Sequence, residues 1–255
     1  MLKRLSDFEV LTFDCYGTLI DWESGMTAGL APLVEAARRK GRVLTRDAVL
    51  EAHARHEVAA QRQTPSKPYR DVLAVVYRRL AEEWAVPAAW DDCAAYGRSV
   101  GDWPAFPDSP AALAYLQRHF RLVILSNVDN ASFAASNARL GVTFDAIYTA
   151  EDIGAYKPDL GNFAYMLDNL AHLGIDKSRI LHTAESLFHD HQPANAVGLA
   201  SCWIHRRHGR EGFGATLEPS QQPRLDFMFT SLADMAAAHR AEQEAGQSAG
   251  QGSGT

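Results

Sequence analysis

Residues 10–19 read Val-Leu-Thr-Phe-Asp-Cys-Tyr-Gly-Thr-Leu, and this stretch decides which fold the rest of the chain can adopt. Its first four residues form a short apolar run typical of a buried parallel strand. Asp14 ends the run, and Gly17 then lets the chain turn sharply away from that carboxylate. Ligands of open α/β sheets bind just outside the carboxyl ends of the strands. We therefore expect Asp14 at the edge of the sheet where ligands bind. There a carboxylate can act as a nucleophile, or it can merely cap a turn.

The chain that follows this strand has a helical pattern until about residue 101. Apolar residues recur at helical spacing in residues 26–37, 48–60 and 69–84, and a fourth helix follows Pro87. Four helices inserted after a single strand predict a separate helical cap over residues 21–101.

Helix and strand alternate from residue 102 onward. Short apolar segments typical of strands lie at residues 122–125, 146–148, 179–183, 201–204 and 227–229. Repeated βα units predict a parallel sheet with right-handed crossovers. We expect an α/β fold with a doubly wound, Rossmann-like core of residues 1–20 and 102–240 and the cap inserted into it. Residues 241–255 lack periodicity and are rich in Gly, Ser, Gln and Ala, so we expect a disordered tail.

Composition excludes several classes of function. A formal charge of −6 gives no basic surface for nucleic acid. No apolar run approaches the roughly 18 residues that cross a membrane. The cysteines are scattered and odd in number, which suits a reducing compartment. The residues before the first strand leave no room for a signal peptide, and we expect a cytoplasmic protein.

Polar residues follow four of the predicted strands, in the loops that a doubly wound sheet brings to one edge. They are Asp14 with Tyr16 and Thr18, then Ser126 and Asn127, then Tyr156-Lys157-Pro158, and finally the acidic loop from Glu185 to Asp190. Each of them alone could be a helix cap. Their joint occurrence in this order predicts an active site.

The order and the residue types of these motifs resemble those of the haloacid dehalogenase superfamily of hydrolases. The resemblance covers nearly the whole chain apart from the tail. The matching motifs are residues 13–19, residues 125–127, residues 156–159 and the stretch from Asp190 to Ile204. Phosphatases of the superfamily usually carry a second Asp two residues after the nucleophile, where this chain has Tyr16. The motif Asp-x-Tyr-Gly-Thr is similar to the corresponding motif of the L-2-haloacid dehalogenase branch.

The resemblance implies a hydrolase that removes halogen from small 2-haloalkanoic acids, without a metal or other cofactor. In the implied mechanism, Asp14 attacks the halogen-bearing carbon and forms an ester. Water then attacks the Asp14 carboxyl carbon and releases a 2-hydroxy acid. The partner implied is a small-molecule carboxylate.

The other site residues receive roles that follow from charge and hydrogen bonding. Lys157 offsets the repulsion between two carboxylates, and we expect it to lower the pKa of Asp14. Asp190 orients the hydrolytic water, with His189 as the second choice. We expect Thr18 to hold Asp14 in place, and Ser126 and the backbone around Tyr16 to bind the substrate carboxylate. Asn127 is expected to bind halide. Trp22 either lines the substrate entrance or packs in the core.

Three positions depart from the dehalogenase pattern. Glu185 and Leu187 stand where the branch typically has Ser and Asn, and Phe163 replaces a Tyr. The arginine with which the family's cap binds halide has no clear counterpart, and the candidates are Arg55 and Arg70.

Glu185 leaves an alternative function open. Asp14, Glu185 and Asp190 together offer three hard oxygen ligands of the kind that Mg²⁺ prefers. The alternative is a Mg²⁺-dependent phosphatase or phosphonatase-like hydrolase that acts through an aspartyl-phosphate. A third class is a binding protein on this scaffold, whose cap could form a homodimer surface.

Overall fold

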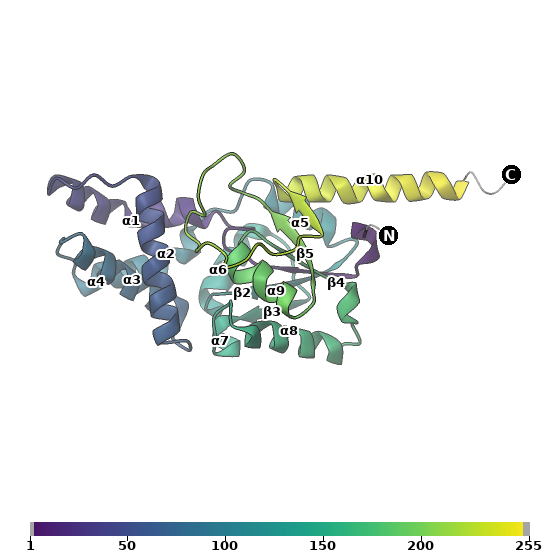
Figure 1. Cartoon of the computed structure of the whole chain (residues 1–255), viewed down its shortest axis with the longest axis horizontal. Helices are drawn as coiled ribbons and strands as arrows, with labels where there is room; N and C mark the ends of the chain where they lie inside the picture. Colours follow the sequence, from purple (N-terminus) through teal and green to yellow (C-terminus); the bar gives the residue numbers. More distant parts are fainter. Residues whose placement is uncertain (1–2, 252–255) are drawn as a thin grey trace.

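The computed structural model describes residues 3–251 and contains a six-stranded, fully parallel sheet with the helices α1–α4 grouped beside it (Figure 1). The strands are β1 (Val10–Phe13), β2 (Arg121–Ser126), β3 (Ala146–Thr149), β4 (Ile180–Ala184), β5 (Ala200–Ile204) and β6 (Phe227–Phe229). Their order in the sheet is β3-β2-β1-β4-β5-β6. The order reverses beside β1, which makes the carboxyl end of this central strand the topological switch point where ligands bind. The predicted α/β doubly wound fold is confirmed.

Helices cover both faces of the sheet because side chains alternate along each buried strand. Leu11 and Phe13 of β1 point into one core cluster and Val10 into the other. The first face is covered by α5 (Ser109–Leu116), α6 (Asn130–Leu140) and α10 (Leu232–Gln251), and the second by α8 (Leu160–His172) and α9 (Gln192–Ala196). One further short helix, α7 (Ala150–Ile153), follows β3.

The cap helices lie to one side of the sheet (Figure 1). They are α1 (Trp22–Arg39), α2 (Arg46–Gln63), α3 (Tyr69–Glu83) and α4 (Trp90–Arg98). Thr45 caps α2 by accepting a hydrogen bond from the backbone of Ala48. The fourth helix begins three residues later than Pro87. We propose residues 21–101 as the cap and residues 1–20 and 102–240 as the core.

The prediction of a disordered tail from residue 241 is wrong as far as Gln251, because α10 continues to that residue. Leu232 and Met235 anchor the start of this helix in the core, and an existing helix extends at low cost through Ala, Glu and Gln. The carboxylate of Glu242 accepts hydrogen bonds from the backbone N–H groups of Leu5 (3.0 Å) and Ser6 (2.9 Å). Residues 252–255 lie outside the described part of the chain.

No helix within residues 3–251 combines the length and the apolar character that a membrane crossing requires. Cys15, Cys93 and Cys202 are all buried as free thiols. A cytoplasmic location stays a prediction.

Candidate functional site

Asp14 lies at the carboxyl end of β1, between the ends of the two neighbouring strands. Phe13 is in register with Ile124 of β2 and with Thr183 of β4, so the loops that follow these strands flank Asp14 on both sides. The carboxylate is buried, and its residue keeps only 6% of its surface exposed. The topology therefore brings the predicted polar loops to one edge.

Lys157 is the centre of a buried network of charges, with only 1% of its surface exposed. Its Nζ donates to Asp14 Oδ1 at 3.0 Å, to the Leu125 carbonyl at 2.8 Å and to Asp190 Oδ1 at 2.6 Å. An ammonium has three N–H donors, so this cation has none left for another ligand. The ring of His182 lies 3.0 Å from the same Asp190 oxygen. The two carboxylates thus share a single ammonium.

Thr18 fixes the second oxygen of the nucleophile candidate. Its hydroxyl donates to Asp14 Oδ2 at 2.9 Å, the contact that the sequence predicts, and accepts a hydrogen bond from the backbone N–H of Glu185 at 2.9 Å. Gly17 has a φ of +92° in the turn between them, a conformation that favours glycine. The turn therefore holds the Asp14 carboxylate in one orientation.

Burial dominates the ionisation of Asp14. Desolvation, together with the nearby Asp190 carboxylate, raises the pKa of Asp14 to about 6, although Lys157 acts to lower it. Lys157 thus acts in the expected direction, but the effect of burial outweighs it. For Asp190, burial is outweighed by Lys157 and His182, which hold its pKa well below the ordinary value. Asp14 can change its protonation near neutral pH, whereas Asp190 stays ionised.

A chamber of about 30 Å³ lies over these groups, between the core and the cap. The core contributes Asp14, Asn127, Lys157, Ser186, His189 and Asp190. The cap contributes Trp22, Glu57, Gln61 and Tyr69. A larger cavity of about 410 Å³ shares Gln61, Lys157 and His189 with this chamber, so a small molecule can reach Asp14 from there.

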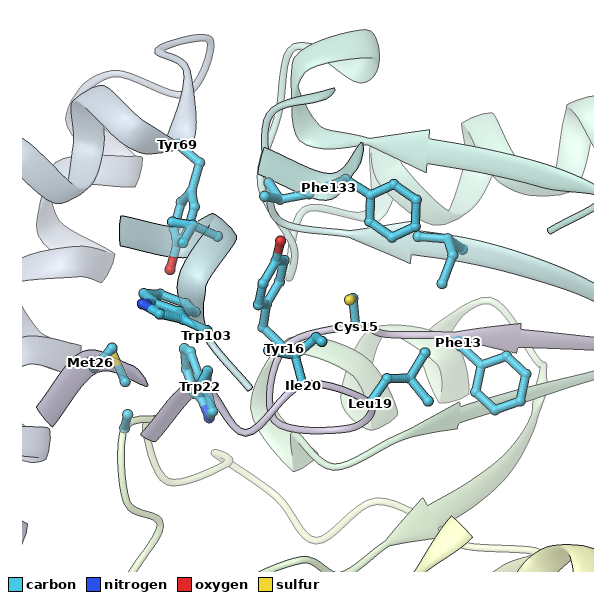
Figure 2. Packing of buried hydrophobic residues seen from close by; sticks show 14 of the residues in the cluster. Phe13, Cys15, Tyr16, Leu19, Ile20, Trp22, Met26, Tyr69, Trp103 and Phe133 are labelled. Carbon is cyan, nitrogen blue, oxygen red and sulfur yellow. The ribbon is translucent and has the colours of Figure 1, made fainter. Parts of the chain in front are cut away.

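Aromatic side chains form the junction between the cap and the core. Figure 2 shows Tyr16, Trp22, Tyr69 and Trp103 together there. The ring of Tyr16 packs edge-on against Trp103 with centroids 5.6 Å apart, and its hydroxyl lies 2.9 Å from Ser136 Oγ. Tyr16 and Trp22 both line the chamber and both belong to the buried core cluster, so the two expectations for Trp22 stay open.

Ser126 and Asn127 differ in what they can still offer a ligand. Asn127 is tied to the backbone of Lys157, because its Nδ2 donates to the Lys157 carbonyl (3.0 Å) and its Oδ1 accepts from the Lys157 N–H (2.7 Å). One N–H of its amide remains for a ligand. Ser126 Oγ is buried and has no hydrogen-bond partner among residues 3–251. This hydroxyl is a free donor, but unlike Asn127 it is not part of the chamber lining.

Neither candidate for the halide-binding arginine lies in the chamber. Arg55 pairs with Glu83 on the cap (3.2 Å), and Arg70 contacts Asp129 through its backbone N–H (3.1 Å). The cap instead presents Glu57 and Gln61, which the sequence analysis missed. No signal in the sequence separates them from the exposed polar residues of the same helix.

The residues named as an alternative magnesium site do not fit a metal ion. Oδ1 of Asp14 and Oδ1 of Asp190 both face the Lys157 ammonium. Glu185 lines a different cavity, of about 70 Å³, with Arg206 and Arg207. Within residues 3–251, no three or more His, Cys, Asp or Glu side chains are arranged to hold a metal. Burial, with Glu23 and Asp14 nearby, raises the pKa of Glu185 to about 8.

Comparison with known proteins identifies the family and relates the fold to solved structures. The family model of the haloacid dehalogenase-like hydrolases matches residues 8–194. No curated protein matches the sequence.

Three solved structures illustrate the shared fold. A defluorinating L-2-haloacid dehalogenase has a TM-score of 0.72 at 20% identity, over 94% of this chain and all of that one. An L-2-haloacid dehalogenase from Xanthobacter autotrophicus has a TM-score of 0.70 at 19% identity, over 91% of this chain and 98% of that one. The HAD-hydrolase YfnB from Bacillus subtilis, bound to magnesium, has a TM-score of 0.68 at 19% identity, over 93% of this chain and all of that one.

Proposed function

Because the chain belongs to the haloacid dehalogenase-like hydrolases, we propose that it hydrolyses the carbon–halogen bond of small 2-haloalkanoic acids with Asp14 as nucleophile. The observation that carries the proposal is the contact of 3.0 Å between the Lys157 ammonium and Asp14 Oδ1. This ammonium offsets part of the negative charge that the substrate carboxylate must approach. The fold shared with L-2-haloacid dehalogenases supports the same chemistry.

In the first step, the ionised Asp14 carboxylate attacks the carbon that bears the halogen. A carbon–oxygen bond forms, the carbon–halogen bond breaks, and halide leaves with the bonding electron pair. Ser126 Oγ donates to the carboxylate of the substrate, and the free N–H of Asn127 donates to the departing halide. Lys157 offsets part of the charge of the two buried carboxylates while a third negative charge approaches.

In the second step, water attacks the carboxyl carbon of the Asp14 ester. Asp190 orients this water but stays ionised, since Lys157 and His182 hold its pKa low. His189 accepts the proton, because burial lowers the pKa of its ring and leaves it neutral. The intermediate then expels the 2-hydroxy acid as an alkoxide, which takes that proton back. Asp14 finally loses a proton to solvent.

The test of this function measures halide release from L-2-chloropropionate with and without EDTA. Metal-independent release that disappears in Asp14→Asn supports the proposal. A single turnover in ¹⁸O-water should place the label in the Asp14 peptide and leave the product unlabelled, because water attacks the ester at the protein carbon.

Two other outcomes would overturn it. Mg²⁺-dependent release of phosphate from p-nitrophenyl phosphate, without halide release, would establish the phosphatase or phosphonatase-like alternative. Activity in neither assay, together with unimpaired self-association or partner binding in Asp14→Asn, would favour a binding protein.

A further inference from the structure

Glu57 is a buried carboxylate that the proposed reaction does not use. It lies in the cap helix α2, with 6% of its surface exposed, and lines the same chamber as Asp14 and Lys157. Because that chamber is small, a ligand bound to Asp14 also lies beside Glu57.

The neighbours of Glu57 leave its carboxylate under-satisfied. Gln61 Nε2 donates to Glu57 Oε1 at 3.1 Å. The Tyr69 hydroxyl also interacts with this carboxylate, which adds to the effect of burial in raising the pKa of Tyr69. His53 Nδ1 lies 3.4 Å from Oε2, yet neither nitrogen of that ring has a hydrogen-bond partner in the described chain. A buried ionised carboxylate needs several donors to offset the loss of water. Its remaining acceptor capacity is open to a ligand.

The charges that line the chamber do not balance. Asp14, Glu57 and Asp190 are carboxylates, and Lys157 is the only Lys or Arg side chain of residues 3–251 that lines it. All three N–H donors of that ammonium are already used. The ring of His189 is neutral, since burial lowers its pKa. A 2-haloacid without another polar group, or a phosphate dianion, would add negative charge and bring no further donor to Glu57.

We propose that Glu57 binds an ammonium group of the substrate, so that the substrates are 2-haloalkanoic acids with an amino group on the carbon chain. This inference rests on the proposed function for the halogen, and on the residues of the chamber for the amine. The ammonium donates to Glu57 Oε2 and offsets the charge that the substrate carboxylate brings in, so the chamber does not become more negative when the substrate binds. Glu57 is therefore a specificity-determining residue supplied by the cap.

Calorimetric titration with ligands that carry no halogen tests the amine site without turnover. The ligands are 3-aminopropionate, 3-hydroxypropionate and propionate. A charge-assisted hydrogen bond predicts that 3-aminopropionate binds about 10- to 100-fold more tightly than propionate. The comparison is made on the wild-type chain, so it stands even if a variant folds poorly.

Two variants of the same helix localise the effect. Glu57→Gln should remove the preference for the amine, because the amide keeps the shape and loses the charge. Glu51→Gln is the matched control, since Glu51 lies on the same helix and is exposed to solvent. This control should keep the full preference.

Several results would overturn the inference. They are equal binding of 3-aminopropionate and propionate, binding of neither, equal binding of 3-hydroxypropionate and 3-aminopropionate, and a preference that survives in Glu57→Gln.

Halide release separates this inference from the proposed function. Release from 3-amino-2-chloropropionate and 2-chloropropionate at equal kcat/KM would refute the amine site and keep the dehalogenase. Preferred binding of 3-aminopropionate without halide release from either acid would refute the dehalogenase and keep the amine site.

Discussion

The titration of Asp14 gives the sharpest quantitative prediction. The nucleophile must be ionised, and its pKa is raised to about 6. For halide release, kcat/KM should therefore fall below pH 6, to roughly one tenth of its plateau at pH 5, because about one Asp14 carboxylate in ten is then ionised. The measurement is initial halide release at low substrate concentration between pH 4.5 and 9.

Substitution Lys157→Met removes the ammonium that lies 3.0 Å from Asp14 Oδ1. A neighbouring opposite charge lowers the pKa of a carboxyl group by about 1–3 units, so the acidic limb should move from about 6 to roughly 7–9. The smaller ionised fraction of Asp14 should then lower kcat/KM at pH 7 by up to about 100-fold, and kcat/KM should partly recover at pH 9. A shift of the limb is a readout that general damage to the fold would not produce.

Lys177→Met is the matched control, because Lys177 is exposed and far from Asp14 in the sheet topology. Its profile should coincide with that of the wild-type chain. A wild-type profile that stays flat from pH 5 to pH 8, or a limb that does not move in Lys157→Met, would refute the electrostatic reasoning.

Three further predictions concern stability and are checked by denaturant unfolding. The pKa of Glu185 is raised to about 8, so the folded chain holds that proton more tightly than the unfolded one, and stability is lost as pH rises from about 4.5 through 8. At pH 9, Glu185→Gln should therefore have a free energy of unfolding about 1–3 kcal/mol higher than the wild-type chain. An unchanged free energy of unfolding there would contradict the pKa shift. Gly97→Ala should cost at least about 2 kcal/mol, since its Cβ would lie 2.1 Å from the backbone oxygen of Arg70; unchanged stability would show that α3 and α4 can separate freely. Glu242→Ala should lower the free energy of unfolding by about 1–2 kcal/mol, because two hydrogen bonds from backbone N–H groups are lost. Glu244→Ala is the control, since Glu244 is exposed, and it should leave the free energy of unfolding unchanged.

The sequence predicted the core well because its signals are local. Short apolar runs that end in Asp14 or Ser126 specify both a buried strand and the edge at which it stops. The order of these units along the chain then limits the sheet to a few topologies. Lys157 could be placed at the same edge on this basis, without knowledge of its contacts.

The cap side of the chamber could not be predicted in the same way. Polar residues lie on several faces of α2, and periodicity does not say which of them meets the core and which meets solvent. Glu57 and the exposed Glu51 look alike in the sequence. Only the position of α2 beside the chamber distinguishes them.

The pKa values of the buried carboxyl groups could not be predicted from the sequence either. The proximity of Lys157 and Asp14 was expected, but the pKa depends on how much water the fold removes and on the distance to Asp190. The same holds for Glu185, whose place in the chain is similar to that of a metal ligand although its side chain lines another cavity.

The position of Asp14 on the central strand has a consequence for the synthesis of the chain. β1 is made first, yet its two neighbours in the sheet, β2 and β4, are made more than a hundred residues later. Asp14 meets Lys157 across 143 positions, and Asp190 is made later still. A nascent or prematurely terminated chain that lacks Lys157 and Asp190 carries the Asp14 carboxylate and the Thr18 hydroxyl that contacts it, but not the ammonium that offsets its charge. Under the proposed function, turnover therefore requires that translation has passed the acidic loop.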